Sequence, residues 1–169
     1  ELTLQIQSND TKGTTQTNRG GWQSQNIFTE GGVENPHQEL NKIKKEISPI
    51  LITEKDTKLE TSVKLKFSSS IVGGFNNDQN FGFFDLDKLV FPLELRKWRD
   101  GDFFYPLGMK VKKKLSDFFI DEKFSILNKK DAWILCSNND IIWVVGSRID
   151  DRYKISINTK KMYIANLLK

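Results

Sequence analysis

The chain has 169 residues, 37% of them hydrophobic, and a net charge of +4 that is unevenly spread: residues 90–169 hold 16 Lys and Arg against 10 Asp and Glu, whereas residues 1–89 hold 10 against 12. This length suits one domain or two small ones, and no apolar run approaches the roughly eighteen residues of a membrane helix. A single cysteine, Cys136, excludes an internal disulfide, so we expect a cytoplasmic protein. We expect no membrane partner, and the excess of positive charge in the second half suggests a phosphate-rich ligand there.

The first half of the chain has weak structural signals. Residues 2–6 alternate as in a strand, but residues 7–35 are polar and glycine-rich and predict a flexible insertion. A short helix is expected from Pro36 or His37 to Ile47, because Leu40 and Ile43 share its apolar spacing. Since the chain lacks an initiator Met, we expect a processed or excised piece.

Strands are expected next, at residues 50–53 and 61–67, the second with alternating apolar and lysine side chains. After a turn rich in Gly and Asn, residues 81–87 predict another strand. We place a domain boundary near residue 80, with a linking region at 1–80 and a C-terminal domain at 81–169.

The second half predicts a β-rich domain with one or two short helices. A helix is expected at residues 114–123, and a second helical turn near Asn128, which can cap it. The expected strands are 132–136, 141–145, 153–157 and 162–165, with Asn138-Asn139-Asp140 closing the first hairpin. The fold class is therefore α+β, with a mixed or antiparallel sheet.

A basic cluster lies between residues 95 and 115. The run Lys112, Lys113 and Lys114, with Lys110 beside it, is by itself typical of a solvated loop. The neighbouring segment adds Arg96, Lys97 and Arg99, and the guanidinium groups suit paired contacts with phosphate oxygens. Together they point to a nucleic-acid interface.

Aromatic residues are interleaved with these cations. We favour core packing for Trp98, while base stacking on Trp98 or Phe104 stays open. Phe103, Phe118 and Phe119 are assigned to the core, and Cys136 is expected to be a buried thiol.

Four ordered blocks resemble the C-terminal domain of bacterial tRNA(Ile)-lysidine synthases, over roughly residues 83–165. They are Leu-Arg-Lys-Trp-Arg-Asp-Gly-Asp (95–102), Pro-Leu-Gly-Met-Lys (106–110), Lys-Lys-Leu-Ser-Asp-Phe-Phe-Ile-Asp (113–121) and Ile-Trp-Val-Val-Gly-Ser-Arg-Ile-Asp (142–150).

This resemblance implies a partner and a division of labour. The domain would hold the acceptor stem of a tRNA and dock on its own N-terminal catalytic domain, which uses ATP to join lysine to the wobble cytidine. It also adds Arg148 to the expected contacts.

No residue set for chemistry is found. The family's Ser-Gly-Gly-x-Asp-Ser loop for ATP is absent, and residues 70–75 are its nearest approach, so this chain alone is expected to be inactive and to have no cofactor. No catalytic or metal-binding residue is assigned, because the carboxylates lie in turns and on a helix surface without ligand spacing. The alternative function is a protein-docking module with a solvated basic face, and the oligomeric state is left open.

Overall fold

The computed structural model describes residues 48–74 and 78–169. The expected strand at 2–6, the insertion at 7–35 and the helix ending at Ile47 lie outside these residues. Every strand pair in the described part is antiparallel, and short helices interrupt the strands, which confirms the α+β class.

The strands form two sheets and one ribbon. The first sheet has the order β1-β5-β8-β9-β10, with β1 (Ile50–Ile52), β5 (Leu93–Lys97), β8 (Trp133–Ser137), β9 (Asp140–Val144) and β10 (Arg148–Ile149). The second has the order β2-β3-β11-β4, with β2 (Lys58–Glu60), β3 (Lys64–Ile71), β11 (Lys161–Leu167) and β4 (Phe81–Asp85). The ribbon pairs β6 (Phe103–Phe104) with β7 (Lys113–Lys114).

The helices within residues 48–74 and 78–169 are short. They are α2 (Leu115–Asp121), α3 (Ile126–Asp131) and the 3₁₀ turns η1 (Leu86–Lys88) and η2 (Asp151–Tyr153). The predicted helix at 114–123 is confirmed as α2. The second helix starts earlier than predicted, because Ser125 caps it by accepting from the Asn128 backbone N–H at 3.1 Å.

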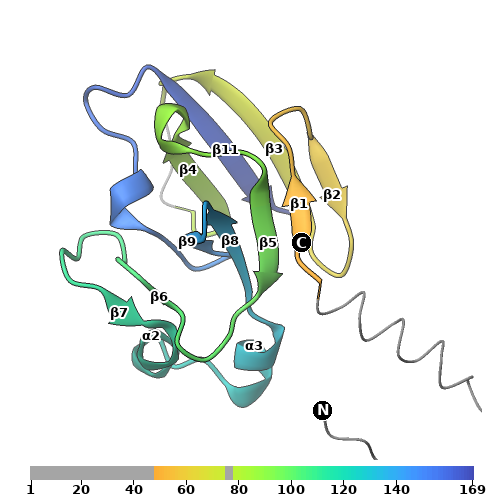
Figure 1. Ribbon diagram of the computed structural model, residues 1–169, viewed down its shortest axis with the longest axis vertical. Coiled ribbons are helices and arrows are strands. Elements are labelled where there is room, and N and C mark those ends of the chain that lie inside the picture. The colour runs from red at the N-terminus through yellow and green to blue at the C-terminus, as the bar shows by residue number, and fades with distance from the viewer. Residues whose placement is uncertain (1–47, 75–77) are drawn as a thin grey trace, which may run out of the picture. The chain divides into compact units, whose positions relative to one another are not determined.

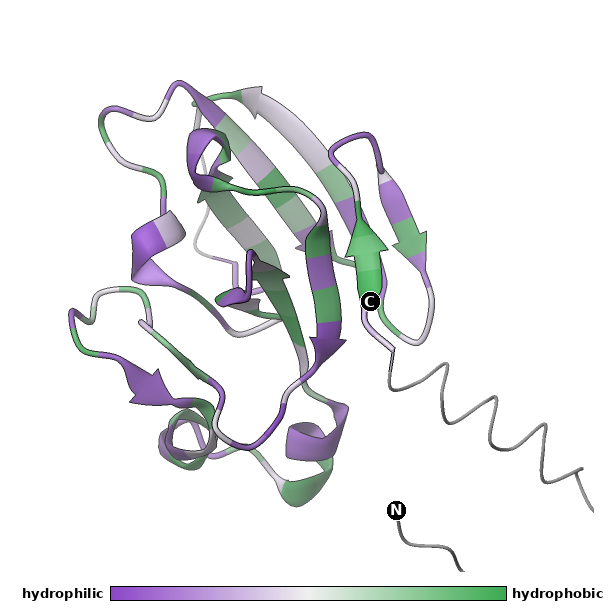
Figure 2. Cartoon of the chain, in the orientation of Figure 1, coloured by the Kyte–Doolittle hydropathy of each residue, from purple (hydrophilic) through white to green (hydrophobic). Residues whose placement is uncertain are grey.

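Two apolar cores lie on opposite faces of the five-stranded sheet. The first fills the space between the sheets and includes Leu65, Phe67 and Leu135. The second lies under α2 and β6, against the neighbouring positions Ile134 and Cys136 of β8. The ribbons of α2, β6 and β7, which border the second core, lie together in Figure 1. Because successive strand residues point to opposite faces, β8 and β9 are apolar on both sides, as their colour in Figure 2 shows.

The β8–β9 hairpin has a tight turn and a β-bulge. Asn138 and Asn139, within the predicted Asn138-Asn139-Asp140 turn, both have positive φ, at 46° and 70°, as a two-residue hairpin turn requires. The register then shifts between Leu135 and Cys136, so that Ile142 is an extra residue on β9. The Ile142 carbonyl is used elsewhere, since it accepts from the Asp150 N–H at 2.8 Å.

Asp150 is fully buried, and its carboxylate accepts four hydrogen bonds. Oδ1 accepts from the backbone N–H and Nε of Arg152 at 2.9 and 3.0 Å. Oδ2 accepts from Arg152 Nη2 at 3.0 Å and from the Tyr105 backbone N–H at 2.9 Å. We call Asp150, Arg152 and Tyr105 the Asp150 cluster; it ties the chain after β6 to the end of β10.

The predicted strand at 153–157 is wrong. Asp150 caps η2 through the Arg152 N–H, and the chain turns there instead of extending. Only Lys154 keeps a single bridge, to Phe84 of β4.

Residue 80 does not divide two compact units. On its N-terminal side, β1 pairs with β5 and β3 pairs with β11. The described residues 48–74 and 78–169 accordingly group as one unit, so the strands assigned to a linking region belong to the same sheets as the C-terminal strands.

Among the residues described, the longest helix has seven residues, and none is long and apolar enough to cross a bilayer.

The buried thiol gives a first test. Cys136 is fully buried, and desolvation raises its pKa to about 12. At pH 8 an unfolded thiol is about one-quarter ionised, whereas the native thiol is ionised to about one part in 10⁴. Iodoacetamide should therefore label the native chain at least about 100-fold more slowly than the chain in guanidinium chloride. Glutathione in both solvents is the control, and similar rates in both states would contradict the burial.

A second test concerns Asp150. Each carboxylate oxygen accepts two donors, so either orientation of the amide in Asp150→Asn turns an NH₂ group against N–H groups. We expect the free energy of unfolding in urea to fall by on the order of 3 kcal/mol. Asp117→Asn, on the exposed side of α2, should stay within about 0.5 kcal/mol of the parent. Equal stability of the two variants would contradict the structural role of the cluster.

Candidate nucleic-acid interface

The β6–β7 ribbon forms the centre of the predicted interface. Phe103 lies opposite Lys114, and Phe104 lies opposite Lys113. Phe104 is fully buried in the second core, which turns Phe103 and Lys114 to the solvent side. Both residues of β7 are lysines, and Figure 2 accordingly colours this strand as hydrophilic.

Four of the eight predicted contacts are exposed and make no ion pair within residues 48–74 and 78–169. We call these the open cations: Arg99, Lys110, Lys112 and Lys114. Lys112 Nζ lies 4.6 Å from the centroid of the Phe103 ring. Lys110 is close enough to Asp151 to contribute to the lowered pKa of that carboxyl group, which is caused mainly by hydrogen bonds from Lys154 and Gly108.

Arg96 has a structural partner. Its two terminal nitrogens donate to the two oxygens of Asp102, both at 2.9 Å, and its side chain is only 12% exposed. These hydrogen bonds raise the pKa of Arg96. Because Asp102 also accepts from the Arg99 backbone N–H at 2.7 Å, the pair fixes the turn that leads into β6. Arg96 is therefore held within the fold by Asp102, and its contact with a nucleic acid stays a prediction.

The remaining three predicted contacts also have partners. Lys97 donates to the Asp131 carbonyl at 2.9 Å and lies over the Trp133 ring, while Lys113 pairs with Asp121 on α2. Arg148 pairs with Glu122 at 3.0 Å. These cations connect elements of the fold, so less of their charge is available to a ligand.

The aromatic residues are placed differently from several predictions. Trp98 packs edge-on against Phe119 and donates to the Lys129 carbonyl at 2.5 Å, which makes it part of the second core. The assignment of Phe118 and Phe119 to the core is confirmed, but that of Phe103 is wrong, because its side chain is 44% exposed. Phe104 is buried and cannot serve as a stacking platform. Because Phe103 and Phe104 are adjacent in a strand, their side chains point to opposite faces, and this alternation is the signal that one of the two rings is exposed.

Two hollows border these residues. One, of about 350 Å³, lies beside Phe103 and is lined by Gly101, Asp117 and the three lysines of β7 and its approach. We call it the ribbon pocket.

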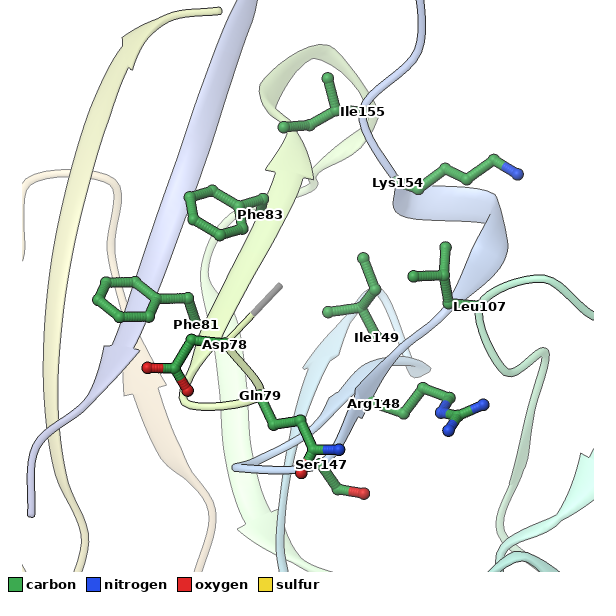
Figure 3. Close-up of a pocket in the computed structure, with 10 residues that line it drawn as sticks. All are labelled: Asp78, Gln79, Phe81, Phe83, Leu107, Ser147, Arg148, Ile149, Lys154 and Ile155. Atoms are coloured by element: carbon green, nitrogen blue, oxygen red, sulfur yellow. The ribbon is translucent and has the colours of Figure 1, made fainter. Parts of the chain in front are cut away.

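The other is a cleft of about 430 Å³ between β4 and β10, with Phe81, Phe83 and Ile149 as apolar walls (Figure 3). Its two cations, Arg148 and Lys154, already hold Glu122 and Asp151. The ribbon pocket therefore offers more unpaired positive charge than the cleft does.

Comparison with known proteins identifies the domain. Residues 93–165 match the model of the TilS substrate C-terminal domain. The tRNA(Ile)-lysidine synthase of Parabacteroides distasonis is 50% identical over 91 residues, which is 54% of this chain and 21% of that enzyme. The synthase of Clostridium tetani is 34% identical over 124 residues, 72% of this chain and 26% of that enzyme. The chain thus spans about a fifth to a quarter of these relatives.

The fold agrees with this assignment. A crystal structure of a TilS C-terminal domain superposes with a TM-score of 0.56 at 18% sequence identity, and the match covers 72% of this chain and 92% of that one. The matched share is larger than residues 93–165 alone, as expected if strands N-terminal to residue 93 also belong to the fold. Residues 93–165 thus match the C-terminal domain family of the tRNA(Ile)-lysidine synthases.

Proposed function

We propose that this chain is the tRNA-binding C-terminal portion of a tRNA(Ile)-lysidine synthase, and that the outer face of the β6–β7 ribbon contacts the acceptor stem. The observation that favours this most is the set of open cations, Arg99, Lys110, Lys112 and Lys114, which lie within residues 99–114 and make no ion pair among the described residues. If these side chains only interacted with solvent, there would be no reason for the cations without ion pairs to lie together in one segment.

The ribbon suits an RNA duplex in particular. The A-form helix hides its base edges in a deep, narrow major groove and displays phosphates and 2′-hydroxyl groups outward. The short ribbon carries Lys114, and the segments next to it carry Arg99, Lys110 and Lys112, so these cations can meet such a surface without entering a groove. We therefore expect recognition of shape and phosphate position more than of base sequence.

The chemistry is assigned to a part of the enzyme outside this chain. This sequence has no Ser-Gly-Gly-x-Asp-Ser loop, so ATP-dependent joining of lysine to the wobble cytidine falls to the catalytic domain. Binding energy from a remote stem can hold the anticodon in that domain's active site, which raises the rate for the correct tRNA.

The open lysines give a direct test. Changing Lys110, Lys112 and Lys114 together to Ala should weaken binding of tRNA to the 169-residue chain, as measured by fluorescence anisotropy. Each lost phosphate contact removes about 0.7 to 0.9 from the log–log slope of affinity against salt, so the slope should become shallower by about 2 to 3.

A matched control has the same change in net charge. Lys64 and Lys66 lie on the outer face of β3, and Lys160 is exposed just before β11. Their triple alanine variant should keep the parent slope. If both triple variants behave alike, the binding is diffuse and the ribbon is not the interface; if the parent shows no salt-dependent binding, the docking-module alternative is favoured.

Two neighbouring arginines separate structure from binding. Arg96→Met leaves Asp102 without its ion-pair partner and should lower the free energy of unfolding by about 2 to 3 kcal/mol, with little change in the salt slope of the folded protein. Arg99→Ala removes an exposed cation and should reduce the slope while stability stays within about 0.5 kcal/mol. If Arg96→Met changed the salt slope and Arg99→Ala lowered the stability, Arg96 would be the binding residue and Arg99 the structural one.

A further inference from the structure

Phe103 is an unusual residue to find on a cationic surface. Its side chain is 44% exposed, although the adjacent Phe104 is completely buried. The exposure follows from strand alternation, since one residue of the pair fills the second core and the other must face out. Phe103 is not part of the second core, so filling that core does not require an aromatic residue at position 103.

The surroundings of the ring fit a ligand with both a flat face and negative charge. Lys114 lies directly across the ribbon from Phe103, and Lys112 Nζ lies 4.6 Å from the ring centroid. Gly101 has a φ of 88° and nothing within 4 Å of the place where a Cβ would be, which leaves open space in the ribbon pocket. Asp117 lines the same pocket and limits where a phosphate can lie.

We propose that Phe103, Lys112 and Lys114 form a binding site for an unpaired nucleotide, with the base stacked on the Phe103 ring and its flanking phosphates held by the two lysines. This inference rests on the proposed tRNA binding. The occupant is the single-stranded 3′ end of the tRNA, because it adjoins the acceptor stem assigned to the same ribbon.

Duplex RNA alone does not account for the ring. Inside a duplex both faces of every base are covered by neighbouring pairs, so an aromatic side chain can stack only on an unpaired or terminal base. Lys112 now covers part of the ring, but a cation–π contact at an exposed site is weaker than base stacking. The flexible lysine can therefore give way to the base and pair with a phosphate instead.

The test compares two RNAs that differ only in the unpaired 3′ nucleotides. One is a tRNA acceptor-stem hairpin with its 3′ extension, in which one base is replaced by 2-aminopurine; the other is the same hairpin without the extension. The 169-residue chain should bind the extended RNA about 5- to 150-fold more tightly, the range expected for stacking of one base. The fluorescence of 2-aminopurine should fall on binding.

The variants assign this difference to the ring. Phe103→Leu should lose both the preference and the fluorescence change, whereas Phe103→Trp should keep them. Val111→Ala is the control, because Val111 is an exposed apolar residue of the same segment, at 72%. It should behave like the parent chain.

The outcomes separate this inference from the proposed function. Equal affinity for the two RNAs, together with a steep salt slope, overturns the nucleotide site and leaves stem binding in place. Failure to bind either RNA overturns both. Should Phe103→Leu prove unstable in urea unfolding, unchanged fluorescence of the extended RNA on binding to the parent chain and to Phe103→Trp still overturns the site.

Discussion

The position of the ribbon depends on one buried carboxylate, that of Asp150. Its four hydrogen bonds hold Arg152 and the Tyr105 backbone N–H, and the Tyr105 carbonyl in turn accepts from the Asp151 N–H at 2.7 Å. The Leu107 N–H adds a bond to the Ile149 carbonyl at 3.0 Å. The connection between β6 and β7 is thereby attached to the five-stranded sheet at several points. A buried charge is tolerated here because every lone pair of the carboxylate has a donor.

The same rule explains why neighbouring cations have different roles. Arg96 and Lys113 lie next to carboxylates that fix a turn and a helix, whereas Arg99 and Lys114 point to solvent. Formal charge along the chain does not distinguish the two groups. Folding places a carboxylate next to some of these cations and not next to others. Only the cations without such a neighbour remain fully available to a phosphate.

Local signals predicted much of the fold. The alternation in β3, the apolar spacing of α2 and the Asn138-Asn139 turn depend on near neighbours in the sequence, and the structure has these elements close to the expected bounds. The errors depend on distant residues. Residues 153–157 read as a strand because their contacts with β4 and with the Asp150 cluster are not visible in the local pattern. The misplaced Phe103 likewise required knowledge of the pairing between β6 and β7, and the predicted boundary missed the long-range pairing of β3 with β11.

The shortness of the ribbon has a consequence for binding. Two-residue strands have little stability of their own, so β6 and β7 depend on Phe104, on the Arg96–Asp102 pair and on the Asp150 cluster for their geometry. These contacts are all made before any ligand arrives. An RNA that meets the open cations then has less backbone to order, and more of each phosphate contact is retained as affinity. The core of this domain and its proposed interface are therefore coupled: a change that loosens Asp150 or Asp102 should weaken RNA binding without touching a single exposed cation.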